Sequence, residues 1–238
     1  MASIAPRSAL RAALAVLALV AALWQLGLRI GADERSRPGA PLRALFFGSS
    51  TTAGSGSSSP SLRWSATLAR RLGWVEVNRG LSGSTLARTG GAIPSGEERW
   101  RAALAGEPAD AVFVMYGAND VLAGIPLGDA GARGTFRHAA AEVLRGIRET
   151  LPRASLVVCA PQPSLATAAA RGPYDRALAE AAAETGAIFV PTGEAFPAER
   201  LGELSADRLH LNDAGHAAVA DFVLARVPAR ERRGRPRR

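Results

Sequence analysis

Short apolar segments alternate with amphipathic segments along most of this chain, and this alternation restricts the fold more than any other feature of the sequence. Five segments are short, rich in Val, Ile, Leu or Phe, and bounded by turn residues. They are Arg43–Phe47, Val75–Asn78, Ala111–Tyr116, Leu156–Ala160 and Ala187–Val190. Their apolar residues run continuously instead of alternating with polar ones, which is typical of strands buried on both faces. These segments are therefore predicted to be the strands of a buried sheet.

The amphipathic segments between the predicted strands place apolar residues at helical spacing. The expected helices are Leu62–Leu72, Glu97–Leu104, Phe136–Leu151, Tyr174–Thr185 and Ala214–Val227. Strands that alternate with helices in this way fold into a parallel sheet with helices on both faces. The expected fold class is therefore α/β, with three layers.

The amino end has the features of an export segment. Arg7 and Arg11 precede an apolar run over residues 12–28, and Arg29 follows it. A helix over this run covers roughly 25 Å, close to the hydrocarbon thickness of a bilayer. We therefore expect residues 1–37 to hold an uncleaved signal anchor or a cleaved signal peptide, followed by a linker; a buried core helix is the remaining alternative. Either export signal carries the body out of the cytoplasm, as a membrane-anchored or as a secreted or periplasmic protein.

The net charge of +8 lies at the two ends of the chain. All 29 basic residues are arginines; five accompany two acidic residues within residues 1–37, and six accompany one within 227–238. Residues 38–226 hold equal numbers of basic and acidic residues. A neutral body does not favour a basic groove that follows phosphates, so we expect no nucleic-acid partner. Residues 38–226 are predicted to form one domain, and 227–238 a disordered basic tail.

The chain contains one cysteine, Cys159, and three histidines, His138, His210 and His216. A single cysteine excludes an internal disulfide and a cysteine-rich zinc module, and three histidines offer little for a cage of several histidines. Cys159 lies in an apolar strand and is expected to be an inert, buried thiol. His138 and His216 are interpreted as helix residues, with His138 on the surface.

Polar segments follow the predicted strands, where ligands bind in an open parallel sheet. The four segments are Gly48–Gly54 after the first strand, Asn78–Gly83 after the second, Gly117–Asp120 after the third, and Asp207–His210 after the fifth. The topology of a parallel sheet brings them to one edge. A serine, a glycine backbone, an asparagine amide and an Asp–His pair are therefore expected to converge there.

These groups are the ones that acyl transfer requires. A serine hydroxyl needs an imidazole to remove its proton, and the imidazole needs a carboxylate to fix its tautomer. Asp207 and His210 are close enough in the sequence to meet through a simple turn. Asn119 offers a side-chain N–H, and Gly83 and Ser50 can offer backbone N–H groups, to stabilise an oxyanion.

The order of the four segments resembles the SGNH, or GDSL-type, hydrolase family over about residues 43–226. The matching blocks are Gly48-x-Ser50, Asn78-x-Gly80-x-Ser82-Gly83, Gly117-x-Asn119-Asp120 and Asp207-x-x-His210. The resemblance implies a catalytic triad of Ser50, Asp207 and His210, with Ser50 as the nucleophile. It also implies an oxyanion hole formed by Ser50, Gly83 and Asn119.

The resemblance further implies a flavodoxin-like α/β/α fold with a five-stranded parallel sheet and no metal or other cofactor. The expected activity is that of a serine esterase acting on an acyl or acetyl ester of a lipid, sugar or small molecule, and we expect a monomer. Two residues depart from the family pattern, since Ser49 stands where the family has Asp and Thr51 where it has Leu. The missing Asp is not a triad member, so the chemistry is expected to survive.

Two other functions are compatible with the same residues. An O-acyltransferase would use the same triad with a sugar hydroxyl as the acceptor in place of water, and a glycan-binding module could keep the fold without catalysis. A dinucleotide-binding fingerprint is a poor match, because the first glycine of Gly54-x-Gly56 lies too far beyond the strand end. The sequence also contains no G-x-S-x-G motif of the α/β-hydrolase nucleophile elbow.

Overall fold

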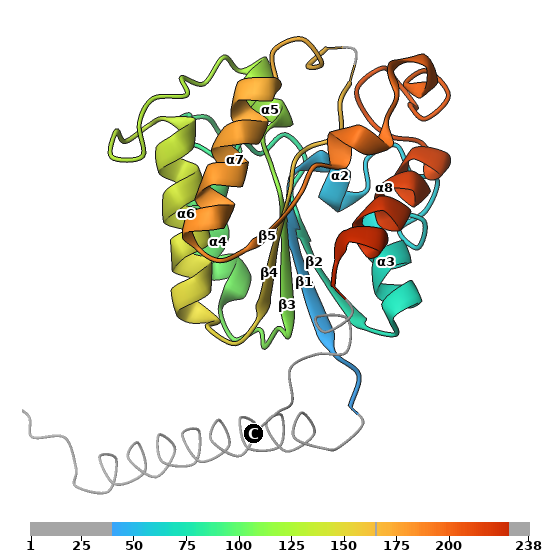
Figure 1. Ribbon diagram of the computed structural model, residues 1–238, viewed down its shortest axis with the longest axis horizontal. Coiled ribbons are helices and arrows are strands. Elements are labelled where there is room, and N and C mark those ends of the chain that lie inside the picture. Colours follow the sequence, from blue (N-terminus) through green and yellow to red (C-terminus); the bar gives the residue numbers. More distant parts are fainter. Residues whose placement is uncertain (1–39, 165, 229–238) are drawn as a thin grey trace, which may run out of the picture. The chain divides into compact units, whose positions relative to one another are not determined.

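The computed structural model describes residues 40–164 and 166–228. Its centre is a sheet of five parallel strands in the order β2-β1-β3-β4-β5 (Figure 1). The strands are β1 (Arg43–Gly48), β2 (Val75–Gly80), β3 (Ala111–Met115), β4 (Ser155–Cys159) and β5 (Ile188–Val190). This order is that of flavodoxin-like, doubly wound sheets. The predicted five-stranded parallel sheet is confirmed.

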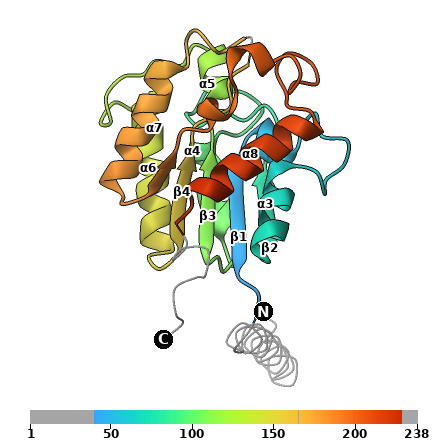
Figure 2. The ribbon, with the colours of Figure 1, turned by 45° about the vertical axis from the view of Figure 1, so that its right-hand side comes forward.

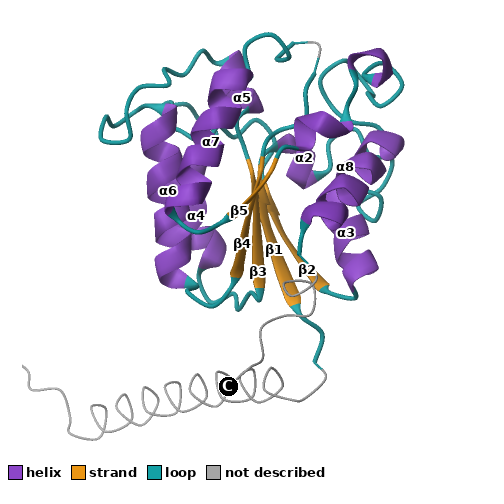
Figure 3. Cartoon of the chain, viewed as in Figure 1, coloured by secondary structure: helices purple, strands orange, loops and turns teal. Residues whose placement is uncertain are grey.

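Helices cover both faces of the sheet, which confirms the expected three layers (Figures 1 and 3). One face carries α4 (Gly96–Leu104), α6 (Phe136–Thr150) and α7 (Gly172–Glu184). The other face carries α3 (Trp64–Leu72) and α8 (Asp213–Arg226), which lie side by side (Figure 2). Neighbouring residues of one strand supply the two cores, since Phe47 packs beneath α4 and α6 while Phe46 packs against Trp64 of α3.

Short helices follow the strands at positions where the sequence analysis expected no helix. They are α2 (Ser50–Ala53), α5 (Ala118–Leu122), and the 3₁₀ turns η1 (Thr192–Ala195) and η2 (Ala198–Arg200). Helices of four or five residues are too short to show an apolar periodicity in the sequence. Ser50, Asn119 and Asp120 therefore lie in first turns of helices and not in open loops.

The strand register aligns the carboxyl ends of the central strands. Gly48 at the end of β1 pairs with Gly80 of β2 on one side and with Met115 of β3 on the other. The segments that follow these strands therefore leave the sheet at one edge. The boundary between β1 and β3 is also the point where the chain reverses its direction of winding, which is where open α/β sheets bind ligands.

The predicted signal anchor or signal peptide in residues 1–37 lies outside the described residues. All of the predicted basic tail beyond Pro228 does so as well. Within residues 40–164 and 166–228, no helix combines the length and the apolar character needed to cross a membrane.

Candidate active site

Ser50 lies just beyond the carboxyl end of β1, as the first residue of α2. It is partly exposed, and its backbone carbonyl accepts hydrogen bonds from the N–H groups of Gly54 and Ser55, both at 2.9 Å. These bonds close the turn after α2. The structure therefore holds the serine at the start of a short, hydrogen-bonded helix, on the boundary between β1 and β3.

Ser49 and Thr51, the two residues that depart from the family pattern, are buried on either side of Ser50. Thr51 Oγ1 donates a 3.0 Å hydrogen bond to Oε1 of Gln162, which is also buried. The Ser49 N–H points to the carbonyl of Met115 at 3.4 Å. Gln162 follows β4, so this bond ties the start of α2 to a segment two strands away. The sequence analysis missed Gln162, because only the fold brings it to Thr51.

Asp207 and His210 form a hydrogen-bonded pair after β5. Nδ1 of His210 lies 2.7 Å from Oδ2 of Asp207, and Oδ1 of Asp207 accepts the backbone N–H groups of His210 at 2.7 Å and Leu209 at 3.1 Å. These hydrogen bonds, from the imidazole first, lower the pKa of Asp207 to about 2. An ionised carboxylate at Nδ1 keeps the proton on that nitrogen and leaves Nε2 of a neutral imidazole free to accept a proton.

The loop around this pair is closed by backbone contacts. Ser205 and Leu211 form an antiparallel bridge, and the N–H of Ala206 donates to the carbonyl of His210 at 2.8 Å. Arg208, between the two partners, has a φ of +69°, which is rare for a residue other than glycine. The turn therefore holds a strained residue so that Asp207 can reach both the backbone and the ring of His210.

The segment that carries His210 packs against the turn that follows α2. Gly56 has a φ of +87°, and a side-chain carbon there would lie 2.2 Å from the carbonyl oxygen of Leu211 and 3.1 Å from Cβ of His210. In the described part of the chain, no hydrogen bond joins the Ser50 hydroxyl to the His210 imidazole. Such bonds are often long without substrate and tighten in the complex.

His216, which the sequence analysis placed in a helix, is a fully buried residue of α8 that binds the same turn. Its Nε2 lies 3.2 Å from the carbonyl of Ser55, and its Nδ1 accepts the N–H of Trp64 at 3.2 Å. The proton therefore resides on Nε2, and burial lowers the pKa of the imidazole. His216 is a neutral structural bridge between α8, α3 and the segment after Ser50.

Gly83 and Asn119 meet at one turn. The N–H of Ser84 donates to the carbonyl of Leu81 at 3.2 Å, and Gly83 within this turn has a φ of +78°. Asn119, in α5, donates from Nδ2 to the carbonyl of Ser84 at 2.9 Å. A side-chain amide nitrogen carries two hydrogens, so Nδ2 keeps a second donor for another acceptor.

Asp120 fixes the rest of the loop after Gly83. Its carboxylate is completely buried and accepts the N–H group of Leu86 at 2.9 and 3.0 Å and that of Ala87 at 3.0 Å. Burial raises the pKa of Asp120 to about 6, and these backbone donors counteract the rise. The sequence analysis named Asp120 only as a member of the Gly117-x-Asn119-Asp120 block and gave it no role. Its hydrogen-bond partners lie more than thirty residues earlier in the chain, so the sequence does not show them.

A pocket of about 440 Å³ opens beside Gly83 and Asn119. Its other walls come from the segment 85–93 and from the end of α5, and they include the exposed apolar side chains of Ile93 and Leu122. The sequence analysis did not point to the wall formed by residues 85–93, since nothing in its composition marks it.

Comparison with known proteins agrees with this geometry. The family model of GDSL-like lipases and acylhydrolases matches residues 46–218. Among solved structures, a protein from Lactobacillus plantarum is 25% identical, with a TM-score of 0.65 over 79% of this chain and 97% of that one. A candidate arylesterase of Agrobacterium tumefaciens is 27% identical, with a TM-score of 0.57 over 77% and 97%. The native aryl esterase of M. smegmatis is 21% identical, with a TM-score of 0.58 over 77% of this chain and 97% of that one.

The comparison with curated protein sequences finds no match. The fold and the family match define this protein as a hydrolase that acts on ester bonds. It belongs to the GDSL-like lipase/acylhydrolase family and has the SGNH hydrolase fold. The family and fold implied by the four sequence blocks are thus confirmed, and the individual roles of the site residues are proposals.

Proposed function

We propose that the protein hydrolyses a carboxylic ester through an acyl-enzyme on Ser50. The observation that carries this proposal is the 2.7 Å contact between Nδ1 of His210 and the carboxylate of Asp207. It leaves Nε2 of His210 as a base for the hydroxyl of Ser50, whose segment packs against the loop that holds His210. A weak nucleophile becomes competent when such a base removes its proton during attack.

In the proposed reaction, Oγ of Ser50 attacks the ester carbonyl carbon while His210 takes the hydroxyl proton. The carbonyl oxygen becomes an oxyanion that accepts hydrogen bonds from the backbone N–H groups of Ser50 and Gly83 and from Nδ2 of Asn119. The intermediate collapses as the bond to the alcohol oxygen breaks, and His210 gives its proton to that oxygen. Water then repeats the sequence on the acyl-enzyme, releasing the acid and restoring Ser50.

We propose that the pocket beside Gly83 and Asn119 takes an apolar group of the substrate. Ile93 and Leu122 are 45% and 47% exposed there, and burying their surface under a ligand is favourable. A volume of about 440 Å³ suits a short acyl chain or an aromatic ring and lies within the range of small-molecule sites. Aryl esterase activity, given for the relative from M. smegmatis, is consistent with this substrate class.

We also propose that residues 1–37 export the protein and hold it in the membrane, with a monomeric catalytic body outside the cytoplasm. The apolar run of residues 12–28 between arginines supports this proposal. A phosphatase fused after residue 238 should then be active, since that reporter needs an oxidising compartment. A mature chain that starts at Asp33 would instead indicate a cleaved signal.

A panel of p-nitrophenyl esters of increasing acyl length tests the activity. We expect the highest kcat/KM for short acyl chains and a loss of at least four powers of ten in Ser50→Ala. Addition of a polysaccharide acceptor separates the hydrolase from an O-acyltransferase, because only the latter moves the acyl group to the sugar. Absence of turnover on every ester, with intact folding, would instead indicate a binding module.

A further inference from the structure

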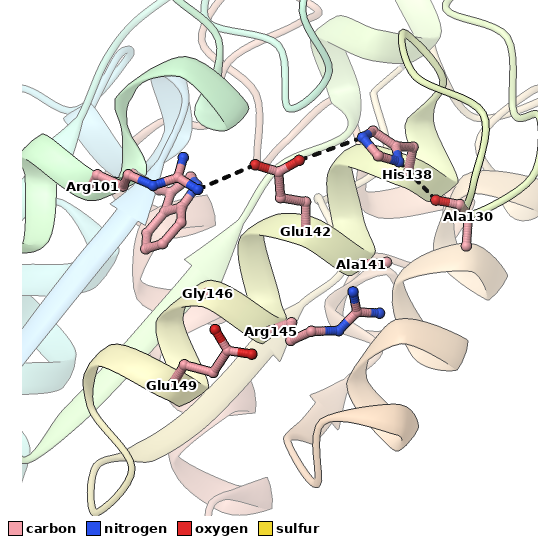
Figure 4. Close-up of a pocket in the computed structure, with 9 residues that line it drawn as sticks. Arg101, Ala130, His138, Ala141, Glu142, Arg145, Gly146 and Glu149 are labelled. Carbon is pink, nitrogen blue, oxygen red and sulfur yellow. Dashed lines mark hydrogen bonds and ion pairs between the residues drawn. The ribbon is translucent and has the colours of Figure 1, made fainter.

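A cluster of three metal-ligating side chains lies between α4 and α6, away from the candidate active site. Glu97 belongs to the first turn of α4, and His138 and Glu142 lie one turn apart on α6. Nε2 of His138 is 3.4 Å from Oε2 of Glu142 and 3.8 Å from Oε1 of Glu97 (Figure 4 shows His138 and Glu142). The three ligand atoms lie within 4.8 Å of one another.

The other polar atom of each side chain already has a partner. Nδ1 of His138 lies 2.7 Å from the carbonyl oxygen of Ala130, as Figure 4 shows. A carbonyl can only accept, so Nδ1 carries a proton, and in the neutral form of the ring Nε2 presents a lone pair. Oε2 of Glu97 accepts the N–H of Arg88 at 3.2 Å, and Oε1 of Glu142 faces the guanidinium of Arg101 at 3.5 Å. With a neutral ring, the three atoms that face one another are all acceptors.

Three acceptors this close call for a positive charge between them, which is either a proton on Nε2 or a metal ion. A proton on Nε2 would form hydrogen bonds to carboxylates, which are normally about 2.7–2.9 Å long. Both distances from Nε2 are well above that range. Around a tetrahedral zinc ion with bonds of about 2.0–2.1 Å, ligand atoms lie roughly 3.3 Å apart. The observed spacing is therefore closer to that of a metal site than to that of an imidazolium ion pair.

We propose that Glu97, His138 and Glu142 bind a divalent cation of the first transition row, with Zn²⁺ as the best match to one imidazole and two carboxylates. The Ala130 carbonyl accepts the proton of Nδ1 and so orients the ring of His138. A hydrogen-bond acceptor at the ring nitrogen that does not bind the metal is usual for zinc-bound histidines. A pocket of about 300 Å³ reaches His138 and Glu142, so water can fill the fourth position. The sequence analysis interpreted His138 as a surface residue; its side chain is only 16% exposed.

This site would join two helices that pack on the same face of the sheet, independently of the chemistry at Ser50. Its expected effect is on stability, since an ion that binds only the folded state shifts unfolding by mass action. The α4 helix also begins directly after the segment that carries Ile93, so the ion would anchor the far end of that pocket wall.

Zinc titration of the metal-free full-length protein, followed by calorimetry and by thermal unfolding, tests the proposal. We expect one equivalent to bind with micromolar or tighter affinity and to raise the melting temperature. The isosteric variants Glu97→Gln and Glu142→Gln, and His138→Gln, should each weaken binding at least tenfold and abolish the shift. Two controls should retain both effects: Glu149→Gln, which lines the same pocket, and His210→Ala, which removes the exposed Asp–His pair as a competing zinc site.

X-ray absorption at the zinc edge of the wild-type protein gives a test that does not depend on the folding of a variant. The proposal requires one imidazole nitrogen and carboxylate oxygens in the first coordination shell. Absence of binding, a coordination shell without imidazole, or binding that survives in Glu97→Gln and Glu142→Gln would overturn it and leave a protonated His138 as the cation. Because none of these readouts is esterase activity, failure of the zinc site and failure of the proposed function are distinguishable.

Discussion

The ring of His210 and the carboxylate of Asp207 are held in contact twice, because Asp207 binds Nδ1 of the ring at 2.7 Å and the backbone N–H of the same residue at 2.7 Å. The first bond sets the tautomer, and the second sets the position of the ring relative to the backbone. A substitution that keeps the shape of Asp207 but replaces one acceptor oxygen with an N–H donor should therefore change the tautomer of His210 without moving the ring.

For this reason, Asp207→Asn should lower kcat by roughly 10³–10⁴, since an amide N–H facing Nδ1 moves the ring proton to Nε2. Steady-state kinetics with a p-nitrophenyl ester measures the effect. Glu203→Gln, which changes an exposed acid of the same segment, should stay within twofold of the wild type. Equal rates in Asp207→Asn and the wild type would remove Asp207 from the mechanism.

Asn119→Ala should lower kcat by about 10²–10³ with little change in KM, because an oxyanion donor acts mainly in the transition state. Part of this loss would come from the turn at Gly83, whose neighbour Ser84 loses the 2.9 Å hydrogen bond from Nδ2. Leu122 lies on the same helix as Asn119 and lines the same pocket. Leu122→Ala removes no hydrogen-bond donor and should change KM. An effect of Asn119→Ala on KM alone would contradict the oxyanion role.

The contribution of Asp120 to the free energy of unfolding should fall as the pH rises from about 4 to about 6. Burial raises its pKa from 3.8 to about 6, so the folded state binds more protons than the unfolded state in this range. The stabilisation that Asp120 contributes is therefore fully present below about pH 4 and is lost above about pH 6. The loss is on the order of 2–3 kcal/mol of unfolding free energy. Denaturant unfolding at several pH values measures it.

Asp120→Asn is the matched variant, because its amide oxygen can still accept the N–H groups of Leu86 and Ala87. Its stability should depend less on pH between 4 and 6 than that of the wild type. Asp175 has a pKa raised by burial to a similar value and remains in both proteins, so only the difference between the two curves reports on Asp120. Parallel curves would show that Asp120 does not titrate in this range.

Gly56→Ala should reduce both stability and activity, because the added carbon would meet the carbonyl of Leu211 and displace the loop that carries His210. Gly73→Ala is the control, since Gly73 also has a positive φ but has nothing within 4 Å of the added carbon. Thermal unfolding and kcat/KM are measured for both. Loss of activity in Gly73→Ala, or full activity in Gly56→Ala, would contradict the proposed contact.

The substrate pocket should respond to the size of Ile93. Ile93→Ala widens the wall beside Gly83, so kcat/KM for longer acyl chains should rise relative to acetate by roughly tenfold, the value of one or two buried methylenes. The ratio of hexanoate to acetate hydrolysis reports on this change. An unaltered ratio would place the acyl group outside this pocket.

Much of the fold could be predicted because buried parallel strands and amphipathic helices are periodic over several residues. Phe46 and Phe47 illustrate this, since their apolar neighbours on both sides indicate a strand buried on two faces. The Asp207–His210 contact was also predictable, because its partners are three residues apart. The hydrogen bond of Thr51 to Gln162 and the cluster of Glu97 with His138 were not, because these partners meet only through the packing of distant segments.

The identity of the acylated residue tests the central claim most directly. The protein is incubated with a fluorophosphonate, digested and analysed by mass spectrometry, together with Ser49→Ala, Ser50→Ala and Ser82→Ala. The account predicts one label, on the peptide that contains Ser50, present in Ser49→Ala and Ser82→Ala and absent in Ser50→Ala. A label that persists in Ser50→Ala, or that lies on Ser49 or Ser82 in the wild-type protein, would contradict it.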